Sequence, residues 1–230
     1  MCIRDSNVPE CEENPAQAFA VNASGVRDLA RACQEAAARL VHVSTDYVFG
    51  NGAQRPYVET DLPAPLNVYG ASKIAGEYLA AAECREHVLV RTSAIYGHAP
   101  CRAKGGKNFV ELMLHLAATR GMVKVVTDEI VSPTFTLALA RQIRMAAEKA
   151  EPGVYHATSQ GECSWFDFAK AIFEETNTQV QLDEATSEDF PSPVRRPDYS
   201  VLDNKHLRDQ GLDIMPDWRE SLSEYFQTRA

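Results

Sequence analysis

The 230-residue sequence has no excess of basic charge, no long apolar run and no cluster of cysteine or histidine. Its formal net charge of −9 argues against a general nucleic-acid binder, because such proteins present a basic face. No apolar run approaches the ~20 residues that a membrane span needs, and no secretory leader is visible. The six cysteines are scattered without metal-ligand spacing, which predicts no metal site and is typical of a reducing cytoplasm.

A glycine-rich phosphate-binding turn is also absent, because neither G-x-x-G-x-x-G nor G-x-G-x-x-G occurs among the 12 glycines. A parallel sheet that binds a dinucleotide normally opens with such a turn, where backbone N–H groups and a helix N-terminus hold the pyrophosphate. Met1–Ser6 does not resemble the first strand of such a unit. The sequence therefore shows no candidate residues for that part of a cofactor site.

Short β-branched runs alternate with helical patterns, which indicates an α/β fold. The runs at 40–45, 88–93 and 123–126 predict buried parallel strands, each preceded by a helix at 15–38, 72–82 or 109–119. Further helices are predicted at 134–150, 164–176 and 217–228, with Ser164 as an N-cap. The polar stretch 183–197 predicts a loop. The insertion at 97–107, which carries Arg102, Lys104 and Lys107, is either a solvated loop or a substrate gate.

Tyr69 and Lys73 lie four residues apart, downstream of the run that ends at Thr45. Four residues is about one helical turn, so a phenol and an ammonium would share one helix face. A tyrosine with an ordinary pKa of about 10 is protonated at neutral pH and can give its proton to a carbonyl oxygen. The pair alone is weak evidence, since a solvated helix start can carry the same residues by chance.

Several motifs in order give the pair a specific context. They are Ser44-Thr45-Asp46-Tyr47-Val48-Phe49, Pro65-Leu66-Asn67-Val68-Tyr69-Gly70-x-Ser72-Lys73, Arg91-Thr92-Ser93, Ser132-Pro133-Thr134 and Arg195-Arg196-Pro197-x-x-Ser200-x-Leu202-Asp203. Together they resemble the dTDP-4-dehydrorhamnose reductase family of extended short-chain dehydrogenases/reductases. The resemblance implies a partial Rossmann-type, doubly wound parallel sheet over 1–100. It also implies a smaller C-terminal substrate-binding lobe over 101–230, interleaved with the Rossmann part near 123–150.

This resemblance implies an enzyme that reduces the 4-keto group of dTDP-4-dehydro-L-rhamnose with NADPH or NADH. The product would be dTDP-L-rhamnose for cell-surface polysaccharide, made in the cytoplasm. By matching positions, Tyr69 is the proton donor, and Lys73 is its partner and a ligand of the cofactor ribose. Thr45 is the hydroxyl that orients the substrate carbonyl.

The resemblance also implies binding residues. Thr92 and Ser93 line the nicotinamide end, although hydroxyls at the strand ends of any α/β protein would look alike. Asp46 contacts the sugar, and Arg196 pairs with the substrate pyrophosphate, for which a guanidinium is well suited. Asn108 either touches the nucleotide sugar or only caps the helix that follows it.

The chain departs from the family in two places. The opening βαβ units are missing, and with them the residues that choose between NADH and NADPH. We therefore expect a gene fragment that is inactive and poorly stable alone, in which Met1–Ser6 is foreign to the fold. Ala94 replaces an aromatic residue that some relatives carry, which leaves the particular deoxy-sugar open.

Two other functional classes are compatible with the same residues. One is a non-catalytic binding protein on the same scaffold, like the regulatory subunit of methionine adenosyltransferase, since fold does not fix function. The other is a related epimerase or dehydratase. A dehydratase typically carries acidic residues directly after this threonine, whereas Thr45 is followed by only one, Asp46, which makes this class less well supported. A homodimer is left open by the sequence.

Overall fold

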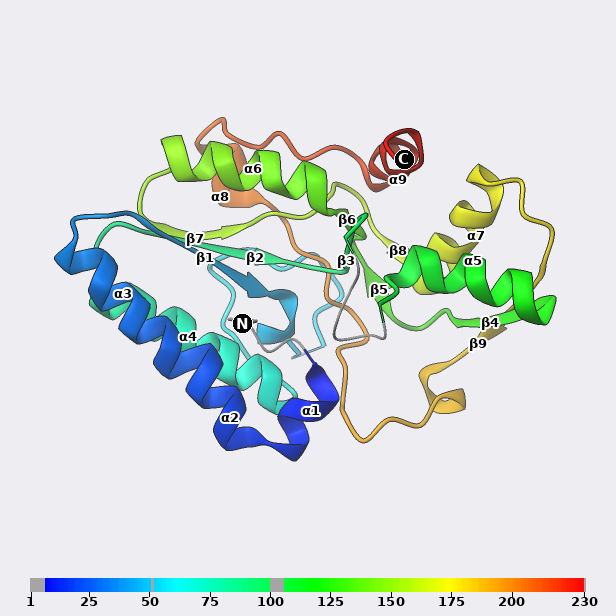
Figure 1. Cartoon of the computed structure of the whole chain (residues 1–230), viewed down its shortest axis with the longest axis horizontal. Helices are drawn as coiled ribbons and strands as arrows, with labels where there is room; N and C mark the ends of the chain where they lie inside the picture. The colour runs from blue at the N-terminus through cyan, green and yellow to red at the C-terminus, as the bar shows by residue number, and fades with distance from the viewer. Residues whose placement is uncertain (1–6, 51, 100–105, 230) are drawn as a thin grey trace.

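The computed structural model describes residues 7–50, 52–99 and 106–229. The expectations for Met1–Ser6, and for Arg102 and Lys104 of the insertion, concern residues outside these ranges. A layered part built on a parallel sheet lies beside a smaller lobe of helices and short strands (Figure 1). This arrangement confirms the predicted α/β class.

The central sheet consists of β1 (Leu40–Thr45), β2 (His87–Thr92) and β7 (Gly153–His156), all parallel, in the order β1-β2-β7. Side chains alternate between its two faces. One face carries Val88 and Val90 and packs against α6 (Thr136–Lys149). The other face carries Leu40 and packs against α3 (Gly25–Glu35) and α4 (Val68–Glu83), which lie below the sheet in Figure 1.

Helix α4 is held close to its neighbours by two glycines. A Cβ on Gly70 would lie 2.1 Å from the Tyr47 carbonyl oxygen, and a Cβ on Gly76 would lie 2.0 Å from the Asn22 carbonyl oxygen. Asn22 belongs to a π-helical turn (Ala20–Ser24) between α2 (Pro15–Phe19) and α3, and its amide donates to the Ser72 hydroxyl. A larger residue at Gly70 would force α4 away from the turn that follows β1, and one at Gly76 would force it away from the π-helical turn.

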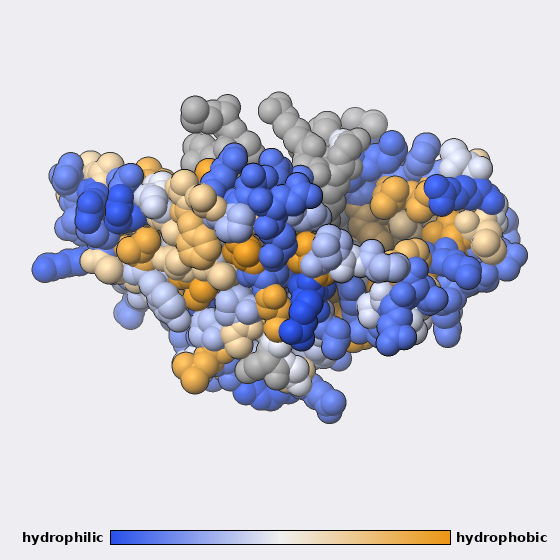
Figure 2. All heavy atoms as spheres, turned by 90° about the horizontal axis from the view of Figure 1, so that it is seen from below, coloured by the Kyte–Doolittle hydropathy of each residue, from blue (hydrophilic) through white to orange (hydrophobic). Residues whose placement is uncertain are grey.

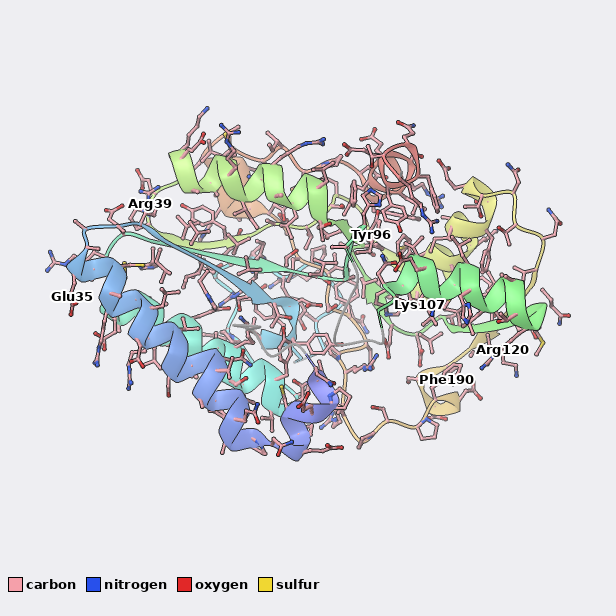
Figure 3. All side chains as sticks on the ribbon, viewed as in Figure 1. Glu35, Arg39, Tyr96, Lys107, Arg120 and Phe190 are labelled. Atoms are coloured by element: carbon pink, nitrogen blue, oxygen red, sulfur yellow. The ribbon has the colours of Figure 1, made fainter. Side chains whose placement is uncertain are left out.

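The lobe is formed by α5 (Phe109–Arg120), β4 (Met122–Val126), α7 (Trp165–Glu175) and β9 (Gln181–Ala185). Its core contains Phe168 and Ile172 of α7, and α9 (Trp218–Gln227) packs Tyr225 against it. Ser164 caps α7 as predicted, with its side chain accepting from the Asp167 N–H. Tyr96, labelled in Figure 3, lies where the sheet part meets this lobe.

The run 123–126 forms a strand, β4, as predicted, but this strand is not part of the central sheet. β4 pairs in parallel with β9 in a separate two-stranded sheet, and its side chains alternate between exposed and buried. The third strand of the central sheet is instead β7, which the sequence analysis missed. The part that returns to the sheet is α6 and β7 (136–156), with α8 (Lys205–Asp209), and it overlaps the predicted region near 123–150 at α6. The predicted loop 183–197 begins inside β9 and contains a 3₁₀ turn (Ser187–Asp189).

Shorter elements complete the described chain. They are α1 (Val8–Glu13), β3 (Ile95–Tyr96), β5 (Ile130–Val131), β6 (Thr134–Phe135), β8 (Cys163–Ser164) and a 3₁₀ turn (Asp46–Val48). None of the helices within these ranges combines the length and apolarity needed to cross a membrane. The face in Figure 2 mixes hydrophobic and hydrophilic residues over α2 to α4, and the exposed large side chains of these helices include Leu29 and Tyr78.

Candidate active site

Thr45 and Thr92 are the last residues of the neighbouring strands β1 and β2. The parallel register pairs Thr45 with Thr92, so both residues lie at the carboxyl edge of the sheet. Ligands of open α/β sheets bind at this edge, outside the carboxyl ends of the strands. The opposite edge is marked in Figure 3 by Arg39, which precedes β1, and by Glu35 at the end of α3. The site therefore lies near the junction with the lobe.

The Asp46 carboxylate accepts several of the hydrogen bonds at this edge. Its Oδ1 accepts from the Thr45 hydroxyl at 3.0 Å, and its Oδ2 accepts from the Ser93 hydroxyl at 2.9 Å. The Ser200 hydroxyl also hydrogen-bonds this carboxylate. Burial raises the pKa of Asp46, and these hydrogen bonds oppose the shift. Asp46 thus has hydrogen-bond partners within the protein, and its contact with the sugar stays a prediction.

Tyr69 and Lys73 both lie on α4, one helical turn apart, as the spacing predicts. The Lys73 ammonium is buried and donates to the Val43 carbonyl at 2.8 Å. It also lies 3.2 Å from Nε2 of His42. Because an ammonium can only donate, this ring nitrogen accepts, and the His42 ring carries its proton on Nδ1. Lys73 is thereby fixed against β1.

The start of α4 is joined to the end of β1 through Tyr47. The Tyr47 backbone N–H donates to the Thr45 hydroxyl oxygen at 3.3 Å. The Tyr47 ring meets the Tyr69 ring edge-on, with centroids 5.9 Å apart. The Tyr47 carbonyl touches the helix at Gly70, where only glycine fits. These contacts bring Thr45 and Tyr69 to the same corner of the sheet.

A buried ion pair lies below this corner. The Glu77 carboxylate, one further turn along α4 from Lys73, accepts from the Arg91 guanidinium of β2 at 2.7 to 3.1 Å. Arg91 also lies over the Phe49 ring, and its Nη1 is 3.5 Å from Nε2 of His156 on β7. The sequence analysis included Arg91 only as part of a motif and missed Glu77. A carboxylate four residues after Lys73 was the available signal.

His156 is neutral within this cluster. Its Nδ1 faces the carbonyl oxygens of Tyr57 and Asp203, which only accept, so this nitrogen carries the proton. Burial, followed by the charge of Arg91, lowers the pKa of His156 to about 3. The cluster therefore holds one ion pair and one uncharged imidazole between α4 and the central sheet.

The two remaining predicted residues have different environments. Asn108 is buried: its side-chain oxygen accepts from the Glu111 N–H at 3.0 Å and its amide donates to the Gly97 carbonyl at 2.6 Å. Asn108 therefore caps α5, which is one of the two roles expected for it. Arg196 is exposed, and its charge acts on both Tyr47 and Glu129.

The residues of this edge fit the nicotinamide and ribose end of a dinucleotide. The Thr92 hydroxyl is buried and has no hydrogen-bond partner within the described parts of the chain, as expected of a group that a ligand would satisfy. Tyr69, Lys73 and Ser93 supply further polar atoms nearby. Residues for the pyrophosphate are not identified in this sequence, which contains no glycine-rich turn.

Comparison with known proteins places the chain in a family. The model of the RmlD substrate binding domain matches residues 5–230. A dTDP-4-dehydrorhamnose reductase of Mycobacterium tuberculosis is 41% identical over 228 residues, covering 96% of this chain and 73% of that protein. The spore coat polysaccharide biosynthesis protein SpsK of Bacillus subtilis is 39% identical over 225 residues, covering 98% of this chain and 77% of that protein.

Solved structures agree with the sequence relatives. A dTDP-4-dehydrorhamnose reductase of Bacillus anthracis, solved in complex with NADP, superposes with a TM-score of 0.91 at 38% identity. The match covers 97% of this chain and 78% of that chain. The chain therefore belongs to the dTDP-4-dehydrorhamnose reductase family.

Proposed function

We propose that the protein reduces the 4-keto group of a dTDP-4-dehydro-6-deoxy sugar with NAD(P)H, as in the conversion of dTDP-4-dehydro-L-rhamnose to dTDP-L-rhamnose. The observation that carries this proposal is the convergence of Thr45, Tyr69 and Lys73 at one corner of the sheet. Family membership supports the substrate class, and the NADP complex of the Bacillus anthracis relative supports the cofactor.

Each residue has a chemical role in this proposal. A reduced nicotinamide, when bound, supplies the hydride that reaches the carbonyl carbon. Tyr69 gives its hydroxyl proton to the carbonyl oxygen, so that the ketone becomes an alcohol. Lys73 stabilises the tyrosine after proton loss and binds ribose hydroxyls. The Thr45 hydroxyl, which donates to Asp46 here, must rotate in order to donate to the carbonyl.

The binding roles follow the same geometry. Thr92 and Ser93 line the nicotinamide end, and Arg196 pairs with the diphosphate of the sugar nucleotide. Asp46 and Asn108 contribute by holding other groups in place, since their polar atoms are already used inside the protein.

The test is an assay of the complete gene product with dTDP-4-dehydro-L-rhamnose and NADPH or NADH. Consumption of the reduced cofactor should match the formation of dTDP-L-rhamnose mole for mole. The Tyr69→Phe variant is assayed in parallel. A folded protein that binds the sugar nucleotide without turning it over would contradict the proposal and favour the non-catalytic binding protein.

A further inference from the structure

The segment 195–200, which we call the arginine segment, lies against the residues that flank Thr45 and Tyr69. It is far from them in sequence, since its contact with Asn67 spans 128 positions. Arg195 and Arg196 are exposed, whereas the flanking Val194 and Pro197 are buried. The two arginines are therefore presented to solvent from a backbone that is fixed on both sides.

One end of the arginine segment is fastened to the start of α4. The Asn67 side chain is buried and uses both ends of its amide. Its oxygen accepts from the Gly70 N–H at 2.8 Å, which caps the helix, and its nitrogen donates to the Arg195 carbonyl at 2.9 Å. Asn67 therefore joins the carbonyl next to Arg196 to the helix that carries Tyr69.

The other end is fastened to the end of β1. Ser200 is buried and hydrogen-bonds the Asp46 carboxylate, which also accepts from Thr45. Between these two anchors, the positive charge of Arg196 acts on the Tyr47 hydroxyl and on the Glu129 carboxylate. Tyr47 touches Thr45 and Tyr69, and the Arg195 carbonyl is bound at the start of the same helix, so the arginine segment passes beside the catalytic corner.

We propose that Asn67 is a positioning residue for substrate binding: its amide nitrogen holds the Arg195 backbone so that Arg196 faces a diphosphate group while the sugar lies at Tyr69. This inference rests on the proposed function and adds a residue outside the Thr45, Tyr69 and Lys73 set. The helix cap and the anchor use different atoms of Asn67, so a substitution can remove one and keep the other.

The experiment compares Asn67→Ser with the parent protein. Serine is as good an N-cap as asparagine, so α4 keeps its start, but serine cannot reach and donate to the Arg195 carbonyl. We expect KM for the sugar nucleotide to rise about threefold to tenfold, with kcat within about twofold, because one hydrogen bond that orders the binding segment is lost. The thermal unfolding midpoint should stay near that of the parent.

A second readout does not depend on activity. Trypsin can cut after Arg195, whereas the bond after Arg196 is followed by Pro197 and resists cleavage. Loss of the anchor should raise the rate of cutting after Arg195 in the folded protein about fivefold, through easier local opening. Asn67→Asp, which also keeps the cap and loses the donor, should behave in the same way.

Gln142→Glu is the matched control. Gln142 is a buried amide on α6 that also donates to a backbone carbonyl, of Leu212, and accepts from a backbone N–H, of Ile214. Its substitution should change neither KM nor the cutting after Arg195. KM and kcat are measured in the complete gene product; absence of turnover there would contradict the proposed function, and the cleavage rate would then decide the anchor alone. Unchanged KM and unchanged cleavage in Asn67→Ser would overturn the inference.

Discussion

Glu77 and Arg91 form an ion pair in which both side chains are almost fully buried, with relative exposures of 2% and 4%. Three hydrogen bonds connect the carboxylate and the guanidinium. Glu77 lies on the same helix as Tyr69 and Lys73, and Arg91 directly precedes Thr92. The pair therefore joins the helix of the proposed proton donor to the strand end that faces the cofactor.

Replacing one partner of this pair should strongly destabilise the fold. Glu77→Ala leaves the Arg91 guanidinium buried without its counter-ion, which costs about 3–5 kcal/mol in the free energy of unfolding. Denaturant unfolding followed by circular dichroism measures this loss. Glu148→Ala is the control, because the Arg144–Glu148 pair is 81% and 54% exposed and should contribute less than about 1 kcal/mol. Equal losses in the two variants would contradict the prediction.

His156 should make stability depend on pH in acid. Its pKa is lowered from 6.5 to about 3 in the fold, so the unfolded chain binds more protons between these values. Stability due to the neutral imidazole is thus complete above pH 6.5 and declines as the pH falls toward 3, by at most about 1.4 kcal/mol per pH unit.

The measurement is urea unfolding of the parent and His156→Gln at several pH values. The stability difference between the two should shrink as the pH falls through that window. The comparison with His156→Gln is needed because Glu59, which accepts from the backbone N–H of His156, also titrates. Burial raises the pKa of Glu59, and a raised carboxyl pKa makes the fold less stable as the pH rises, which is opposite to the effect of His156. A difference independent of pH would show that His156 is not the titrating group.

Tyr69→Phe should remove most turnover while the protein still binds its cofactor. The ring and its contact with Tyr47 are kept, but the proton that reaches the carbonyl oxygen is lost. General acid groups contribute about 100- to 10,000-fold, so kcat should fall by that factor in the complete gene product. Cofactor binding is followed by fluorescence titration. Turnover equal to that of the parent would exclude Tyr69 as the proton donor.

Gly70→Ala should damage both stability and activity. The new methyl group would lie 2.1 Å from the Tyr47 carbonyl oxygen, so α4 must move away from the end of β1. The strain should cost about 1–3 kcal/mol, more than the gain in helix propensity. Gly25→Ala is the control, since its Cβ would meet only the Ala20 carbonyl at 3.5 Å. Thermal unfolding and kcat of both variants check the prediction.

Local patterns were sufficient to predict much of the fold. The helices at 136–149, 165–175 and 218–227 were predicted because each has a helical pattern, and the second begins at a recognisable cap, Ser164. The one-turn relation between Tyr69 and Lys73 needed only the helical rise. β7 was missed because it has four residues and begins with glycine, and β9 because its sequence is polar.

Tertiary relationships lay beyond these patterns. β4 has the composition of a strand buried on both faces, but α5 and α7 cover only the face that carries Val123 and Val125. The sequence of β4 does not contain this information. Asp46 was expected to meet the sugar, and the register that brings Ser93 beneath it could not be inferred from either segment alone. The capping and anchoring roles of Asn67 also depend on a contact between distant parts of the chain.

β7 joins the central sheet only after the chain has formed part of the lobe, and this order affects how cooperatively the protein unfolds. The chain leaves the sheet after β2, builds α5 and β4, returns through α6 and β7, and leaves again for α7 and β9. No single cut of the backbone separates the sheet from the lobe, and a fragment ending near residue 100 would leave Val88 and Val90 without the helix that covers them. Sheet and lobe should therefore melt in one transition, and neither can be produced as an independent module from one contiguous stretch of the gene.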